Sequence, residues 1–335
     1  MTHASTVLIL GARGRFGQAA ARAFARAGWQ VLGQVRPGAQ GPAIAGVHWL
    51  GLAPSDTAAL THAARGAAVV VNALNPVYTH KAWRTQAPAL LESAIRASQA
   101  LGATLMLPGN VYNFGESMPA LLREDTAQAA TGVKGRIRIA MEQRLRAATQ
   151  DGSLRAVVIR AGDFFGSGTG SWLDQAVAKD LLRGRVTWPG PLNVATPWAY
   201  LPDLARSFVQ VAQQRSRLDA FAQLHFAGHT VTGQQWVDAL TSVAWDQGWL
   251  PAERALRVRR MPWPLLRVAG LVLPTLAALA EMRYLWRTPH QLHNHTLCAL
   301  IGDEPRTPFD DAVRQSLRDL GLLGRTARAT PVATA

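Results

Sequence analysis

The stretch that decides the fold is VLILGARGRFGQAAARAFARAG, residues 7–28. Its first four residues are apolar and lack helical spacing, which is typical of a short buried strand. Gly11, Gly14 and Gly17 follow, and the apolar residues after them recur at helical spacing as far as Gly28, a residue suited to ending a helix. The pattern therefore predicts a strand, a tight glycine turn and a helix in direct succession.

The glycine turn has the chemistry of a dinucleotide site. Its glycines allow a tight turn, a close approach of backbone N–H groups to a pyrophosphate, and close packing of the helix on the strand. An ordinary glycine-rich turn is the alternative, and the strand before it and the helix after it argue against that alternative. We therefore expect the turn to bind a cofactor through Gly11, Arg13, Gly14, Arg15, Phe16 and Gly17.

Short apolar runs alternate with helical patterns along the first half of the chain. Such alternation indicates parallel strands joined by right-handed crossovers, with helices on both faces and the ligand at the carboxyl ends of the strands. The predicted fold class is an α/β, Rossmann-like, doubly wound parallel sheet over residues 1–162. The expected strands are 7–10, 29–35, 47–52, 67–74, 103–109 and 155–162, with further helices at 56–64 and 133–148.

This alternation stops near residue 163. Residues 163–325 are predicted to form a smaller, mostly helical lobe on the substrate side, some segments of which can return to the sheet. Residues 326–335, TARATPVATA, carry no apolar pattern and are expected to be a disordered tail. The tryptophan-containing segments GSWLDQ and VTWPGP favour a partly apolar substrate pocket.

Composition excludes several other classes of protein. Cys298 is the only cysteine, so an internal disulfide is impossible, and the start of the chain lacks a signal-peptide pattern; both facts favour the cytoplasm. The net charge of +14 comes from scattered arginines without a nucleic-acid-binding motif, so we expect no nucleic-acid partner. His290, His293 and His295 lack a further ligand at metal-binding spacing, and we expect surface histidines and no metal.

Residues 261–280, MPWPLLRVAGLVLPTLAALA, are strongly apolar but include one arginine and three prolines. Their longest uncharged run is too short to span a bilayer comfortably. We expect no transmembrane segment here, but a buried or interfacial helix, with peripheral membrane contact as the lesser alternative.

The end of the second predicted strand indicates the form of the cofactor. An acidic residue there would bind the adenosine ribose, but this chain has Arg36. A guanidinium group matches a 2′-phosphate, so NADP(H) is favoured over NAD(H). A solvated surface charge at Arg36 is the alternative.

The spacing GxxGxxG resembles the short-chain dehydrogenase/reductase superfamily, in its extended and atypical branches. NALNPVYT from Asn72, LPGNVYNFG from Leu107 and IRAGDFFG from Ile159 are similar to the cofactor and substrate loops of NAD-dependent epimerase/dehydratase-like members. The resemblance implies further cofactor contacts at Ala73, Leu74, Asn75, Pro108, Gly109, Ala161 and Gly162.

The chain departs from this superfamily at its catalytic pair. Most members use Tyr-x-x-x-Lys on one helix, and here Lys134 falls at the tyrosine position and Arg138 at the lysine position. This departure disfavours a sugar-nucleotide epimerase or dehydratase. The helix KGRIRIAME resembles instead the isoflavone-reductase-like and NmrA-like branch, in which the helix lysine is the proposed general acid/base.

Lys134 therefore has three possible roles. Burial and the charge of Arg138 would lower its pKa towards neutrality, as proton transfer requires. It could also bind the nicotinamide ribose without doing chemistry. The third possibility is a solvated stripe of Lys134, Arg138 and Glu142, with Arg138 and Glu142 paired, because these residues lie four positions apart.

These observations give one main hypothesis and one competitor. The main hypothesis is an NADP(H)-dependent oxidoreductase acting on a small, partly apolar molecule, with a homodimer possible. The competitor is a non-catalytic NADP(H)-binding sensor. The candidate catalytic residues are Lys134, Asn110 and Tyr112, with Tyr78, Asn75 and Asp163 facing the same crevice.

Overall fold

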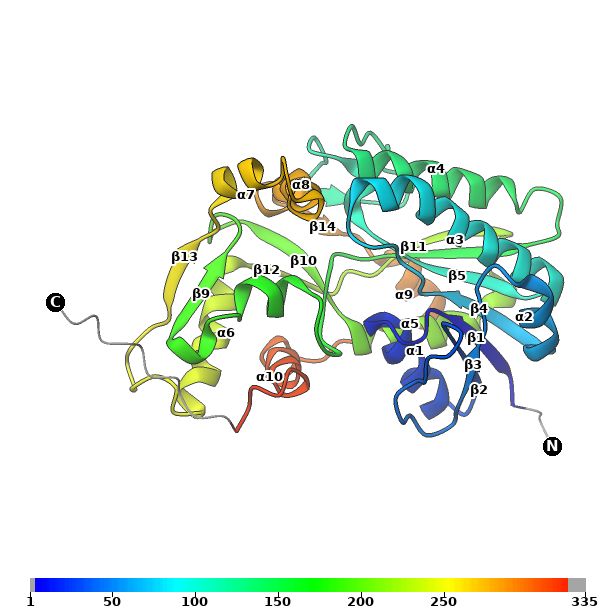
Figure 1. Cartoon of the computed structure of the whole chain (residues 1–335), viewed down its shortest axis with the longest axis horizontal. Helices are drawn as coiled ribbons and strands as arrows, with labels where there is room; N and C mark the ends of the chain where they lie inside the picture. Colours follow the sequence, from blue (N-terminus) through cyan, green and yellow to red (C-terminus); the bar gives the residue numbers. More distant parts are fainter. Residues whose placement is uncertain (1–3, 325–335) are drawn as a thin grey trace.

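A computed structural model of the chain describes residues 4–324. Figure 1 shows two parts side by side: a parallel sheet covered by helices on both faces, and a lobe of short strands and helices beyond the carboxyl ends of the sheet. The predicted tail, residues 326–335, lies outside the described residues.

The central sheet has seven strands, and every pair within it is parallel. The inner strands are buried on both faces, which explains why they read as continuous apolar runs. In spatial order the strands are β11 (Phe221–His225), β7 (Arg155–Arg160), β5 (Thr104–Gly109), β4 (Ala67–Asn72), β1 (Thr6–Leu10), β2 (Gln30–Val35) and β3 (Val47–Gly51).

Helices cover both faces of this sheet. Apolar side chains of α1 (Arg15–Arg26), α5 (Leu201–Gln213) and α9 (His295–Ile301) pack against one face. The other face is covered by α2 (Thr57–Ala63), α3 (His80–Leu101) and α4 (Val133–Ala147).

The predicted fold class is confirmed, and each predicted strand of the first half occurs within about two residues of its expected bounds. The second half also contributes to the sheet, because β11 pairs with β7 and α5 packs on α1. The part that contains the central sheet is therefore assembled from both halves of the chain.

The lobe combines short strands with helices. Its three-stranded sheet has the order β12-β10-β8, and two further strand pairs, β13-β9 and β14-β6, complete it. The strands are β6 (Leu121–Leu122), β8 (Asp163–Phe165), β9 (Arg185–Trp188), β10 (Ala195–Tyr200), β12 (His229–Thr232), β13 (Arg257–Arg260) and β14 (Gln291–Leu292). The helices are α6 (Gly233–Asp246), α7 (Trp263–Ala269), α8 (Pro274–Ala280) and α10 (Phe309–Asp319), with short helical segments η1 (Val111–Phe114), η2 (Leu173–Val177), η3 (Leu181–Arg183) and η5 (Glu281–Trp286). A further turn, η4 (Arg215–Arg217), lies between α5 and β11 of the central sheet.

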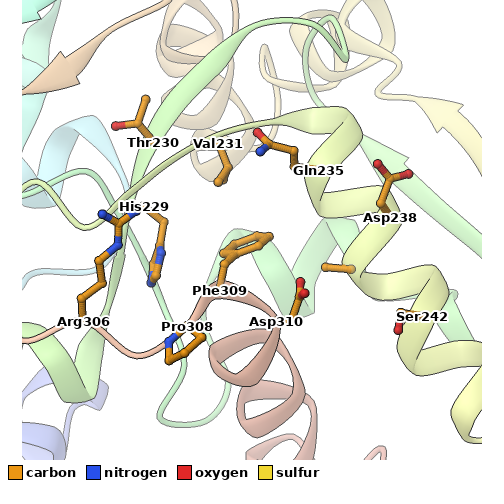
Figure 2. A pocket seen from close by; sticks show the side chains of 11 residues that line it. His229, Thr230, Val231, Gln235, Asp238, Ser242, Arg306, Pro308, Phe309 and Asp310 are labelled. Atoms are coloured by element: carbon orange, nitrogen blue, oxygen red, sulfur yellow. The ribbon is translucent and has the colours of Figure 1, made fainter.

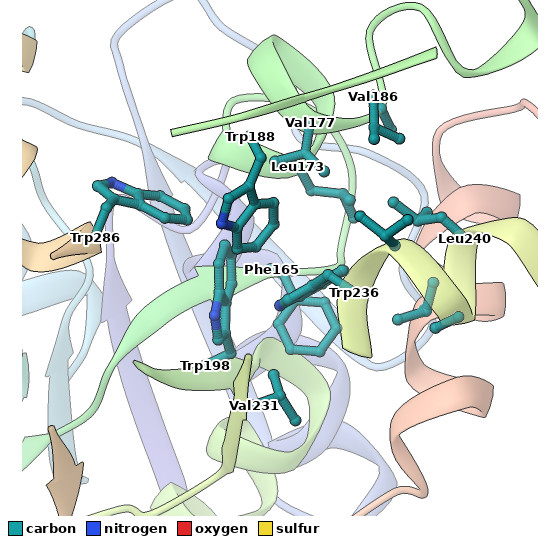
Figure 3. Close-up of a cluster of buried hydrophobic side chains, with 14 of the residues drawn as sticks. Phe165, Leu173, Val177, Val186, Trp188, Trp198, Val231, Trp236, Leu240 and Trp286 are labelled. Atoms are coloured by element: carbon teal, nitrogen blue, oxygen red, sulfur yellow. The ribbon is translucent and has the colours of Figure 1, made fainter. Parts of the chain in front are cut away.

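Aromatic side chains form the core of the lobe (Figure 3). The ring centres of Trp198 and Trp236 lie 4.7 Å apart, and Phe165 packs edge-on against Trp236 at 5.1 Å. Trp188, which the sequence placed near a pocket, lies in this core with only 3% of its surface exposed. The one tryptophan of VTWPGP therefore stabilises the lobe and does not line the cavity described below.

Candidate functional site

The glycine turn between β1 and α1 requires glycine at two positions for different reasons. Gly11 has φ of +71°, a conformation that side chains strongly disfavour. A Cβ on Gly17 would lie 2.5 Å from the carbonyl oxygen of Gly11, whereas a Cβ on Gly14 would lie 3.3 Å from the same oxygen. Gly17 thus permits close packing of helix on strand, and Gly14 faces the open side of the turn.

A cavity of about 860 Å³ lies at the carboxyl ends of the central strands. Its walls come from the glycine turn, the ends of β4 and β5, helices α3 and α4, the segment after β7, and the inner faces of α7 and α8. Of the residues predicted to bind cofactor or substrate, it is lined by Gly14, Arg15, Phe16, Ala73, Leu74, Asn75, Tyr78, Pro108, Gly109, Asn110, Tyr112, Gly162 and Asp163.

Two phenols meet in this cavity. The hydroxyl oxygens of Tyr78 and Tyr112 lie 3.4 Å apart. Burial, together with the nearby carboxyl of Asp163, raises the pKa of Tyr112 to about 12, against the lowering effects of the Tyr78 hydrogen bond and the Arg138 guanidinium. At neutral pH Tyr112 is therefore a protonated phenol that can donate a hydrogen bond or a proton.

Asp163 supplies the second titrating group. It begins β8 and pairs with Trp198 of β10, so its backbone is fixed by the lobe sheet. Burial raises the pKa of its carboxyl to about 7. A carboxyl that titrates near neutrality can exchange a proton at physiological pH, as general acid–base catalysis requires.

Arg138 projects from α4 into the same cavity. Its guanidinium lies over the ring of Trp83, 5.2 Å from the ring centre. Within residues 4–324, the buried Nε of Arg138 has no hydrogen-bond partner. A guanidinium that lines a cavity is suited to bind the hydroxyls or phosphates of a dinucleotide.

Lys134 lies beside this cluster but is held away from the cavity. It is completely buried, its Nζ donates to the carbonyl oxygen of Ala278 at 2.6 Å, and it forms an ion pair with Glu281 at 3.1 Å. The same ammonium lies over the ring of Tyr78, 4.5 Å from its centre. Burial lowers the pKa of Lys134, while Glu281 acts in the opposite direction. In this arrangement the ammonium contacts the ring of Tyr78 but does not line the cavity.

The solvated charge stripe on α4, one of the three roles considered for Lys134, does not form. Lys134 and Glu142 are both buried, and Glu142 forms an ion pair with Arg160 of β7 at 2.7 Å instead of with Arg138. Arg160 also donates to the backbone carbonyl of Asn110. The Arg160–Glu142 pair therefore fixes the backbone at the end of β5, directly before η1, the turn that contains Tyr112.

Other predicted residues hold the backbone around the site in place. The side chain of Asn110 accepts a hydrogen bond from the backbone N–H of Tyr112 at 3.1 Å, and that of Asn72 accepts from Leu74 at 3.2 Å. Ala161 is fully buried in the apolar core beneath the cavity.

The three arginines expected to bind phosphate differ in their surroundings. Arg15 spans the cleft between the two parts and donates to the carbonyl oxygens of Gly166 and Phe164, at 3.1 and 3.3 Å. Arg13 and Arg36 are exposed, and Arg36 directly follows β2. Arg36 therefore has its guanidinium free in water, while Arg15 joins the lobe to the sheet.

Sequence reasoning missed several walls of the cavity. The sequence indicated Arg138 only as a charge near Lys134. Its place at the superfamily's lysine position was a signal that it lies in the site. Trp83 gave none, because its contact with α4 depends on tertiary packing. Residues 261–280, predicted as a buried or interfacial helix, form the two short helices α7 and α8, in which Leu266, Leu276 and Leu279 are half-buried and line the cavity. Leu265, Leu271 and Leu273 are exposed, which corrects the expected burial, and contact with a membrane interface stays a prediction.

A second cavity, of about 640 Å³, lies between α6 and the start of α10 (Figure 2). His229, Arg306, Phe309 and Asp310 contribute to it, and burial lowers the pKa of His229 to about 4. It shares no lining residue with the first cavity and lies away from the glycine turn. It is the weaker candidate for chemistry.

The described part of the chain contains no cluster of three or more histidine, cysteine or acidic side chains suited to a metal ion. His290 is a correction to the expectation of surface histidines: it is buried, and its Nδ1 contacts the carbonyl oxygen of Thr288 at 2.8 Å. Among residues 4–324, no helix is both long and apolar enough to cross a membrane.

The parallel sheet, the glycine turn before α1 and the cavity at the strand ends define a Rossmann-like protein of the NAD(P)-binding class. Residues 7–223, more than half of the chain, match the NAD dependent epimerase/dehydratase family. The chain belongs to this family, within the extended short-chain dehydrogenase/reductase superfamily.

Solved structures with similar folds include several epimerases. UDP-glucose 4-epimerase from Brucella ovis in complex with NAD has a TM-score of 0.70 and 14% identity, covering 93% of this chain and 97% of its own. UDP-N-acetylglucosamine 4-epimerase from Bacillus cereus has a TM-score of 0.71 and 11% identity, covering 96% and 99%. The enzyme WbmH from Bordetella bronchiseptica in complex with NAD+ has a TM-score of 0.69 and 16% identity, covering 95% and 98%. No curated protein matches the sequence.

Proposed function

We propose that the chain is a nicotinamide-dinucleotide-dependent oxidoreductase of the epimerase/dehydratase type, with Tyr112 as its proton-transfer residue. The observation that carries the proposal is the single cavity that joins the glycine turn to Tyr78, Tyr112, Arg138 and Asp163. When bound, the nicotinamide would accept or donate hydride. The family match favours this chemistry over the simple reductase that the missing catalytic tyrosine first indicated.

Different residues of the cavity would contact different parts of the cofactor. The backbone at Gly14 and the start of α1 would hold the pyrophosphate, because a helix N-terminus attracts anions. Arg138, which lines the cavity, would bind a polar group of the cofactor through its guanidinium. Gly162, which also lines the cavity, allows the close approach of β10, because a Cβ there would clash with the backbone carbonyl of Pro197.

Proton transfer would begin at the hydroxyl of Tyr112. As a protonated phenol it can donate to a carbonyl oxygen that is being reduced. Tyr78, 3.4 Å away, is placed to stabilise the resulting phenolate by hydrogen bonding. Asp163, titrating near pH 7, would exchange the proton with solvent.

Two substrate classes have support. A sugar nucleotide is favoured by the family and by UDP-sugar epimerases among the structures of similar fold. A partly apolar alcohol or ketone is favoured by the cavity wall of Trp83, Trp172, Leu266, Leu276 and Leu279.

Cofactor binding is the first test. We expect NADPH to bind more tightly than NADH in a fluorescence titration, and Arg36→Ala to weaken NADPH alone by about tenfold or more, since a guanidinium–phosphate contact is charge-assisted. Equal loss for both nucleotides would refute the assigned role of Arg36. The NAD complexes of similar structures make tighter NADH binding the alternative result.

Turnover is the second test. UDP-sugars would be followed by product separation, and apolar alcohols and ketones by cofactor absorbance. Turnover lost in Tyr112→Phe would support the proposal. Nucleotide binding without turnover across both panels would favour the sensor, and binding of neither nucleotide would overturn both functions.

A further inference from the structure

Helices α7 and α8 form a short hairpin at the outside of the lobe (Figure 1). The turn between them contains Leu271, Val272 and Leu273, which expose 86%, 82% and 54% of their surface. Leu265 and Val268 of α7 are also more than 65% exposed. Five large apolar side chains within nine residues are unusual on a protein surface and indicate an interaction site.

The hairpin is held firmly by its other face. Trp263 is buried and donates its indole N–H to the carbonyl oxygen of Pro189 at 2.6 Å. Ala278 of α8 accepts the hydrogen bond from Lys134, and Leu266 and Leu276 line the large cavity. The exposed residues are therefore presented by an anchored hairpin.

Positive charge surrounds the apolar tip. Arg257, Arg259 and Arg260 are exposed on β13, which leads directly into α7, and Arg267 is exposed on α7 itself. Residues 251–290 contain seven arginines and two glutamates, and one of the glutamates, Glu281, is paired with Lys134. The surface thus combines an apolar tip with a cationic border.

We propose that the α7–α8 hairpin docks on an anionic lipid membrane. The leucine and valine side chains of the tip would enter the boundary between headgroups and acyl chains, while the arginines bind lipid phosphates. A second copy of the chain fits this surface less well, because symmetrical contact would bring two arginine borders together. Membrane binding is independent of the proposed function, since none of the five exposed residues lines the cavity.

The docked hairpin would place the candidate site beside the membrane. Its inner face forms one wall of the cavity, so the same two helices would contact lipid on one side and ligand on the other. Together with the proposed oxidoreductase function, this arrangement favours a lipophilic alcohol or ketone as substrate.

The test is co-sedimentation of the full chain with vesicles. The wild type is expected to bind phosphatidylcholine vesicles that contain phosphatidylglycerol, and to bind phosphatidylcholine alone at least about tenfold more weakly. Leu271→Ser with Val272→Ser should reduce binding by about tenfold or more, while Leu271→Ile with Val272→Leu keeps it. Arg259→Gln with Arg260→Gln should weaken binding to the anionic vesicles, and Arg26→Gln with Arg96→Gln, on α1 and α3, should change it less.

Each other outcome would overturn the proposal. Absence of binding to the anionic vesicles, or equal binding of the serine variant and wild type, would exclude the hairpin as the docking element. A wild-type dimer that becomes a monomer in the serine variant, without vesicle binding, would assign the surface to a second copy. Thermal unfolding of the same variants checks their folding, and nucleotide titration tests the proposed function separately, so that failure of docking is distinguished from failure of the proposed function.

Discussion

The ammonium of Lys134 lies 3.1 Å from Oε2 of Glu281, and this ion pair fastens α4 to the segment that follows α8. Nε2 of His80, at the start of α3, contacts the same carboxylate oxygen at 2.7 Å. Three elements that are distant in sequence thus meet at one carboxylate behind the Tyr78 ring. Lys134, whose position resembles a catalytic lysine in sequence, thus takes part in a contact that joins three elements of the fold.

Replacement of Lys134 tests this contact. We expect Lys134→Met to lower the free energy of unfolding by about 2–4 kcal/mol, because Glu281 would keep its charge in a largely buried position without its main partner. Urea denaturation measures the loss. Lys81→Met, at an exposed position of α3, is the control and should change stability little. Unchanged stability with abolished turnover would return Lys134 to the role of general acid/base.

The paired phenols predict unequal effects of two similar substitutions. Tyr112→Phe should lower kcat by about 10²–10⁴-fold, because it removes the proton donor. Tyr78→Phe should lower kcat less, since it removes only a hydrogen-bond partner of that donor. Nucleotide binding, measured by fluorescence, should be retained in both. A larger loss in Tyr78→Phe would exchange the two assigned roles.

Asp163 predicts a pH dependence of stability. Its pKa of about 7 in the folded protein is above the ordinary value of an aspartate, so between about pH 4 and pH 7 the folded protein holds a proton that the unfolded chain has lost. Stability contributed by this group is therefore present at low pH and is lost as pH rises through that window, by up to about 4 kcal/mol.

Asp163→Asn isolates this contribution. Because the amide does not titrate, urea denaturation at several pH values should show a smaller decline in unfolding free energy with rising pH than in wild type. Asp203 and Glu304 also have raised pKa values, so the difference between the two proteins is the informative quantity. Parallel curves would show that Asp163 titrates normally.

The two glycines of the turn predict separable defects. Gly17→Ala would place a Cβ 2.5 Å from the carbonyl oxygen of Gly11, and we expect a loss of about 1–3 kcal/mol in stability from the forced backbone shift. Gly14→Ala meets only one atom, at 3.3 Å, and should fold nearly normally but bind nucleotide more weakly because it lines the cavity. Thermal unfolding with and without NADPH distinguishes the two defects.

The sequence alone determined the Rossmann-like fold and its glycine turn. These features depend on local patterns: buried parallel strands are continuous apolar runs, the crossover helices carry helical periodicity, and the turn needs glycine where a side chain would clash. The cavity residues at the ends of β4 and β5 followed, because parallel topology brings the carboxyl ends of strands to one edge.

Only the tertiary structure decided which side chains of the site contact one another. The contacts of Lys134 with Glu281, Tyr78 with Tyr112, and Arg160 with Glu142 join segments that no local period relates. The return of β11 to the sheet and the two-faced α7–α8 hairpin have the same origin. The packing of distant elements decides which ammonium is neutralised, which phenols line the cavity and which leucines face water. Residue spacing along the chain does not encode these contacts.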